Sequence, residues 1–173
     1  MSNFQKKYYY DFKSVDGKNH TVEIWQDTPT VIIATKINGA PYPFVVTLPG
    51  ITHKFQPVRG TGADLNLFAT STMQFMDLYT ANMQEYQVRH YINSTLNWCG
   101  FLDTELFSSD LSRQKNYSVE ITANDGFALL DRINYVQSDG SKYTGFTSQY
   151  ELLKFIIQKL NLPYINIYIG HLS

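Results

Sequence analysis

Apolar and polar residues alternate with a period of two along much of this chain, beginning close to its N-terminus. Tyr8, Tyr10 and Phe12 fall on one face of an extended segment, and the intervening residues fall on the other. This alternation is typical of a half-buried β-strand. Asp16-Gly17 follows, a pair that supplies the positive φ of a tight hairpin turn. The alternation resumes over residues 20–26, with Val22 and Ile24 on one face and Trp25 on the other, so this part of the chain predicts a β-hairpin.

The same pattern, separated by turn signals, predicts further strands. Asn38-Gly39 predicts a second hairpin turn. Pro41 and Pro43 confine the next segment to an edge or a turn, because proline cannot donate to a sheet ladder. Short strands at regular spacing are typical of a sandwich or a small barrel. The further strands are expected at residues 30–37, 44–48, 53–58, 63–70, 85–93, 95–103, 117–123 and 165–169. Alternation within 63–70 places Leu65 and Leu67 on its inner face.

Helical spacing becomes prominent after residue 124. The apolar residues of 127–133 are three and four positions apart, which predicts a short helix capped by Asp125 or Asn124. A longer helix is expected over 148–160, because its first residues form a capping box and its apolar residues form one stripe. Both helices therefore lie near the C-terminal end.

We therefore expect a single domain over residues 1–173 that is mainly β (α+β). Its body would be an antiparallel β-barrel or split barrel, on which the helical segment at about 125–160 packs. Aromatic residues make up 15% of the chain, with 13 Tyr and 11 Phe. Aromatic side chains suit a pleated, half-buried surface and broad subunit contacts, so composition agrees with this architecture.

Charge and cysteine content exclude several classes of function. Charged residues make up only 17% of the chain and the net charge is −1, so the chain has no general attraction to nucleic acid or to anionic membranes. No apolar run approaches the length of a membrane helix, and the polar and aromatic first ten residues lead us to expect no secretion signal. Cys99 is the single cysteine, so we expect no internal disulfide and no cysteine-based zinc site. We read Cys99 as a small buried apolar residue.

Candidate chemistry along the chain is sparse, so we expect no enzyme and no cofactor or metal site. The four histidines lack metal-ligand spacing, and His90 lies on the apolar face of its strand, as a core histidine would. Gly60-Thr61-Gly62 is too short for a phosphate loop. A weaker alternative is a carboxylate pair for glycoside hydrolysis in one loop. The carboxylates of that loop are Asp103, Glu105 and Asp110, and the histidines are His20, His53, His90 and His171.

Between Phe55 and Tyr135 the chain carries three motifs that resemble the tail-hub proteins of bacteriophages, which are related in fold to the central hub of contractile tails and of type VI secretion spikes. The motifs are Phe-Gln-Pro-Val-Arg-Gly-Thr at 55–61, Asn-Trp-Cys-Gly-Phe-Leu at 97–102, and a strand-to-helix segment with Ala-Asn-Asp-Gly at 123–126. The likeness is greatest to hubs of phages that infect Bacteroidetes, including the crAss-like group. The residues that carry it are Pro57, Arg59, Gly60, Trp98, Gly100, Asp125, Gly126, Leu129 and Leu130.

The resemblance implies a scaffold of the virion tail, assembled in the cytoplasm of the bacterial host. Copies of the chain would form a homo-oligomeric ring, a trimer or hexamer, around an axial channel. The ring would contact neighbouring tail proteins and no membrane, and DNA would meet it only in passage. Many members are longer and carry a second barrel, so the chain resembles a compact member or part of a longer hub.

The alternative function is a carbohydrate-binding β-sandwich of a bacterial surface-glycan system. Exposed aromatic rings are the usual platforms for flat, partly apolar ligands such as sugars. The candidate rings are Trp25, Trp98 and the tyrosines of 8–10. A ring-forming scaffold and a monomeric sugar binder differ in their mass in solution and in their response to glycans.

Overall fold

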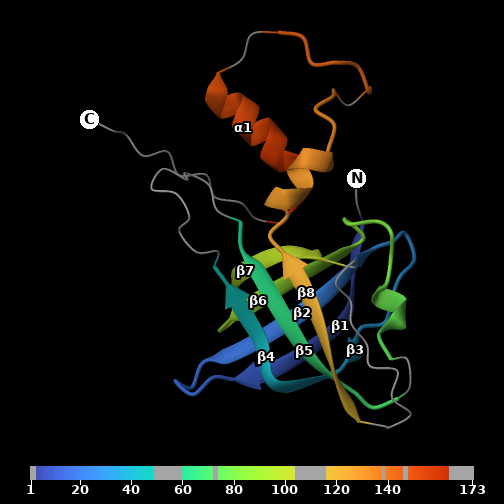
Figure 1. The fold of residues 1–173 in the computed structure, drawn as a ribbon, viewed down its shortest axis with the longest axis vertical. Helices are drawn as coiled ribbons and strands as arrows, with labels where there is room; N and C mark the ends of the chain where they lie inside the picture. The colour runs from blue at the N-terminus through green and yellow to red at the C-terminus, as the bar shows by residue number, and fades with distance from the viewer. Residues whose placement is uncertain are drawn as a thin grey trace.

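The computed structural model describes residues 3–48, 60–71, 74–103, 116–137, 139–145 and 148–163. The described part of the protein is mainly β. The described strands form one mixed sheet of eight, in the order β3-β1-β2-β6-β7-β8-β5-β4 (Figure 1). The strands are β1 (Phe4–Lys13), β2 (Asn19–Asp27), β3 (Thr35–Lys36), β4 (Asn38–Thr47), β5 (Gly62–Ala69), β6 (Tyr86–Ile92), β7 (Thr95–Leu102) and β8 (Tyr117–Asn124).

The predicted N-terminal hairpin is confirmed. β1 and β2 pair antiparallel, with Tyr10 opposite Val22, and Gly17 takes a φ of 83° in the turn. One extra residue bulges from β1 between Lys6 and Tyr8, where the register shifts. The bulge changes which side chains of β1 face outward, and it places Lys6 opposite Trp25 on the neighbouring strand.

The expected hairpin at Asn38-Gly39 is wrong. β3 pairs parallel with β1, whereas β4 pairs antiparallel with β5, so the chain passes through Asn38 and Gly39 without folding back. A Cβ at Gly39 would stand 2.7 Å from the Pro43 Cβ and 3.3 Å from the Tyr10 ring. Close packing against Pro43 and Tyr10 therefore explains why position 39 is a glycine.

The expected antiparallel β-barrel or split barrel is also wrong, because the sheet is mixed and is not closed into a barrel. Its two end strands, β3 and β4, come from one extended segment that leaves β1 and joins β5. Pro41 and Pro43 lack the N–H that a ladder needs, and Tyr42 between them has a φ of 56°. The register of β4 with β5 also jumps between Gly39 and Phe44. Ladder formation is thus interrupted at the place where the sheet would have to close.

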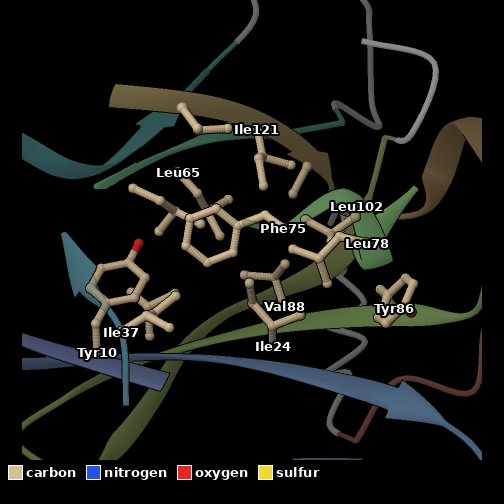
Figure 2. Packing of buried hydrophobic residues seen from close by; sticks show 14 of the residues in the cluster. Tyr10, Ile24, Ile37, Leu65, Phe75, Leu78, Tyr86, Val88, Leu102 and Ile121 are labelled. Carbon is tan, nitrogen blue, oxygen red and sulfur yellow. The ribbon is translucent and has the colours of Figure 1, made fainter. Parts of the chain in front are cut away.

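One face of the sheet covers the main hydrophobic core (Figure 2). In β5, buried residues alternate with partly exposed ones, as the sequence predicts, and Leu65 and Leu67 are fully buried opposite Ile121 and Val119 of β8. Two side chains from outside the strands, Phe75 and Leu78, complete the core near η1 (Met76–Leu78), a short 3₁₀ helix. Close packing of this kind holds the curvature of the sheet fixed.

A second cluster joins the sheet to the helical segment, which lies beyond the end of β8 in Figure 1. Phe101 of β7, Leu129 and Leu160 are its buried members. The expectation of two α-helices is wrong, since the described residues contain one, α1 (Gln149–Gln158). The first predicted helix is a 3₁₀ helix, η3 (Phe127–Arg132), with an N–H···O bond of 3.0 Å from Leu129 to Gly126.

The ends of both helices depend on local backbone chemistry. The N-cap position of η3 is Gly126, with a φ of 85°, and the Asp125 carboxylate accepts a 3.1 Å hydrogen bond from the Phe127 N–H, which is the backbone contact predicted for it. Ser148 caps α1 as expected, because its Oγ accepts a 3.2 Å hydrogen bond from the Glu151 N–H. The helix ends earlier than predicted, and Asn161 has a φ of 53° just beyond it. The last predicted strand, at 165–169, lies outside the described residues.

Candidate functional site

Residues of two predicted motifs meet at the junction between the sheet and the helical segment. The Asp125 carboxylate accepts hydrogen bonds from the Thr61 N–H (2.5 Å), the Thr61 hydroxyl (3.0 Å) and the Phe127 N–H (3.1 Å). The indole N–H of Trp98 donates to the same Thr61 hydroxyl at 2.9 Å. This chain of bonds ties β7, the start of β5 and the start of η3 together. Its arrangement is that of a structural joint.

At this joint, neighbouring atoms lie so close to two motif positions that only glycine fits there. A Cβ at Gly100 would stand 2.1 Å from the Asn124 carbonyl oxygen and 2.5 Å from the Trp98 ring. Gly126 has a positive φ, and a Cβ there would lie 3.2 Å from the Phe101 ring. Both positions therefore exclude larger residues for packing reasons.

The other motif residues divide into those near the joint and those outside the described residues. Gly60 lies beside Asp125, because a Cβ there would stand 3.5 Å from its carboxylate. Leu129 is buried and Leu130 packs on the same cluster. Pro57 and Arg59 fall outside the described residues.

A small pocket of about 170 Å³ opens beside the joint, and both Asp125 and Cys99 line it. Cys99 is a half-buried free thiol. Burial raises the pKa of this thiol to about 12, so it stays protonated at neutral pH. A protonated thiol is a poor nucleophile and a poor metal ligand, so this pocket is not suited to thiol chemistry.

The carboxylate alternative remains without a structural description. Asp103 follows directly after β7, but Glu105 and Asp110 lie outside the described residues. Among the residues that the structure does describe, no three His, Cys, Asp or Glu side chains gather closely enough to hold a metal ion. None of the helices in the described part of the chain is long and apolar enough to cross a membrane.

The structure brings two of the four histidines together, which the sequence analysis did not anticipate. His20 Nδ1 lies 2.9 Å from His90 Nε2, although the residues are 70 positions apart. His90 is 4% exposed, which confirms it as a core histidine, and its ring packs 4.4 Å from that of Phe44. Pairing of β2 with β6 places His90 opposite Val22, next to His20 on the same face. His53 and His171 lie outside the described residues.

The histidine pair belongs to a longer chain of hydrogen bonds. Ser14 donates its hydroxyl proton to the Asp16 carboxylate and therefore accepts from His20 Nε2, 3.0 Å away. His20 Nδ1 is then the acceptor of a proton on His90 Nε2. His90 Nδ1 accepts in turn from the Asn97 amide at 3.4 Å. In this arrangement the serine proton faces a carboxylate instead of a base.

The outer face of β1, β2 and β6 carries a second group of aromatic and charged side chains. The guanidinium carbon of Arg89 lies 4.0 Å from the centre of the Trp25 ring. Glu23 accepts from the Trp25 indole N–H at 2.9 Å and pairs with Lys6 at 2.7 Å. Tyr9 extends this group, since the Lys6 ammonium also lies 5.5 Å from its ring. We call these five residues the outer aromatic face.

Of the rings considered for sugar binding, only some lie on this open face. Trp98 is 8% exposed and faces the core, so it is not a surface platform. Tyr10 is buried and Tyr8 packs against the core. Trp25 and Tyr9 alternate with these inward residues and remain available. The sequence pattern had already assigned Trp25 to the face opposite the core.

Comparison of the whole chain with protein-family models, with curated proteins and with solved structures finds no match.

Proposed function

We propose that this chain is a structural subunit that assembles with copies of itself. The observation that carries the proposal is the second half of β4, an end strand of the sheet. Residues 44–48, which are the last four residues of β4 and the Leu48 that follows, read Phe-Val-Val-Thr-Leu and contain no charge, proline or glycine. Val45 is 41% exposed, Val46 38% and Leu48 73%. We call residues 44–48 the β4 edge.

An edge of this composition is unusual for a strand that faces water. Proteins ordinarily protect end strands with charged residues, proline or bulges, because free N–H and C=O groups invite pairing with another strand. Pro41 and Pro43 interrupt the first half of β4, but that protection ends at Phe44. Alternating side chains point to opposite faces of a strand, so Val45 and Val46 leave both faces apolar. The β4 edge therefore favours burial against another strand.

A second copy of the chain is the partner that we propose. The chain has 14 basic and 15 acidic residues, so copies meet without strong mutual repulsion. An isolated edge strand can add to the sheet of a neighbour, and repetition of such a contact around an axis gives a closed ring. The phage tail hub is the setting suggested by the sequence resemblance, with neighbouring tail proteins above and below and DNA passing through the channel.

Light scattering on a size-exclusion column tests self-assembly directly. We expect the wild-type chain to elute as an oligomer, with a mass of two or more whole multiples of 19.9 kDa. Val45→Lys places a charge on the β4 edge and should shift the population to monomer. Val15→Lys is the matched control, because Val15 is fully exposed in the β1–β2 turn, and it should leave the oligomer intact.

Two outcomes would contradict the proposal. If the wild-type chain is a monomer at high concentration, it does not self-assemble. If the oligomer persists in Val45→Lys, the β4 edge is not its interface. Images of the purified oligomer by negative stain would then test the finer proposal, because a hub requires a ring with a central opening.

A further inference from the structure

We propose that the outer aromatic face binds a neutral saccharide. This inference goes beyond self-assembly, because it concerns β1, β2 and β6 and not the β4 edge. A depression of about 380 Å³ opens on this face, lined by Thr21, Glu23, Trp25, Tyr91 and Ser94. Its volume lies in the range of small-molecule sites, about 300–1,000 Å³.

The lining of the depression combines one flat apolar ring with several hydrogen-bonding oxygens. Trp25 supplies the ring, Glu23 a carboxylate, and Thr21, Tyr91 and Ser94 hydroxyl groups. A sugar presents C–H groups on its ring faces and hydroxyl groups around its rim. The C–H faces suit an indole, and the rim hydroxyls suit carboxylate and hydroxyl partners, which can accept or exchange protons.

The aromatic ring is held in place before any ligand arrives. Its indole N–H is bonded to Glu23, and Arg89 is stacked on it. Arg89 is itself fixed, because its Nε and one terminal nitrogen donate to the Gln87 side chain at 3.1 and 2.9 Å. Gln87 is fully buried, and its amide donates at 3.0 Å to the carbonyl of Asn161 beyond α1. Such support lowers the entropic cost of binding.

The charged groups of the site already have partners within the protein, which suits a neutral ligand. Glu23 forms an ion pair with Lys6, and its carboxylate keeps lone pairs beyond the two bonds that it accepts. Arg89 is stacked and bonded to Gln87, so its guanidinium is already occupied by this support. The lone pairs that remain on the Glu23 carboxylate can accept hydrogen bonds from ligand hydroxyl groups, which a neutral saccharide supplies. A neutral saccharide therefore fits better than a nucleotide.

Tryptophan fluorescence gives a direct test, because the chain has only Trp25 and Trp98. In a Trp98→Phe background, emission reports on Trp25 alone. Maltohexaose, cellohexaose, N-acetylchitohexaose and a deoxythymidine oligomer would each be titrated to millimolar concentration, and a broad glycan array would extend the set of sugars. We expect a saturable change in emission with at least one saccharide and none with the oligonucleotide.

Variants then separate this site from other exposed rings. With the wild-type chain on the array or in calorimetry, Trp25→Ala should raise the Kd for the bound saccharide by about tenfold or more. Tyr150→Ala is the control, since Tyr150 is an exposed ring on α1, and it should leave the Kd unchanged. Circular dichroism establishes that each variant is folded. The proposal is overturned if no saccharide on the array binds, if binding survives Trp25→Ala, or if only the oligonucleotide binds.

Discussion

Lowering the pH from about 6.5 to 4 is expected to reduce the free energy of unfolding by about 3 kcal/mol through His90 alone. Burial, followed by the nearby His20, lowers the pKa of His90 from 6.5 to about 4. In the unfolded chain His90 takes up a proton near pH 6.5, whereas in the folded chain it resists protonation until about pH 4. The stabilisation is therefore complete above pH 6.5 and is lost as the pH falls through this window.

The hydrogen-bonded chain explains why the neutral ring is required. His90 Nδ1 accepts from Asn97, so a proton added at this nitrogen would face an N–H donor. The ring also packs against Phe44 and is 4% exposed, which leaves little room for water to solvate a charge. The pKa values of Asp11, Asp16 and Asp139 are lowered, so their contributions are lost only below their ordinary value of about 4. Between pH 4 and 6.5, the change in the free energy of unfolding therefore comes mainly from histidine.

Urea unfolding at a series of pH values measures this dependence. His90→Gln removes the titrating ring, so its free energy of unfolding should be lower at pH 7 but nearly flat between pH 6.5 and 4. His20→Gln is the matched control and should keep most of the fall, because burial is the larger cause of the His90 shift. A wild-type curve that is flat in this window, or an equally steep curve in His90→Gln, would show that His90 is not responsible.

The alternation of residues was sufficient to predict the faces of several strands. A period of two assigns each side chain to a face without reference to the rest of the chain. Leu65 and Leu67 were placed inward and Trp25 outward on this basis, and both assignments hold. Strand existence and orientation of side chains thus follow from local sequence when one face is buried.

Features that depend on distant contacts could not be predicted in the same way. Asn38-Gly39 has the composition of a hairpin turn, yet the Tyr10 ring and Pro43 pack against Gly39 and hold the chain extended. The His20–His90 pair appears only once β2 and β6 are aligned. The depression on the outer aromatic face likewise forms only when Tyr91, near the end of β6, and Ser94, in the turn after β6, lie beside Trp25 of β2. Register between distant strands is the information that the local pattern lacks.

The joint between β7 and the end of β8 leads to the other large expected effect. Gly100→Ala should reduce the free energy of unfolding by about 3 kcal/mol or more, because overpacking against fixed backbone cannot be relieved by a side-chain rotation. The new methyl group would lie 2.1 Å from the Asn124 carbonyl oxygen, so β7 and β8 would have to separate. The ladder of these strands is short: it pairs Phe101 with Asn124 and Leu102 with Ala123, and the Asp103 N–H just after β7 donates to the Thr122 carbonyl at 2.8 Å. A small separation would therefore remove much of their ladder.

Gly62→Ala provides a close control, because Gly62 lies in β5 opposite the same Asn124. A Cβ at Gly62 would meet the Ala123 carbonyl oxygen at 3.7 Å, an ordinary contact. The free energy of unfolding of Gly62→Ala should stay within about 1 kcal/mol of the wild type. Alanine also lowers the conformational entropy of the unfolded chain, which stabilises the folded state. Urea unfolding of both variants measures the difference. Equal stability of the two variants would mean that β7 and β8 are not packed as closely as the structure places them, and that the motif glycine at position 100 has another purpose.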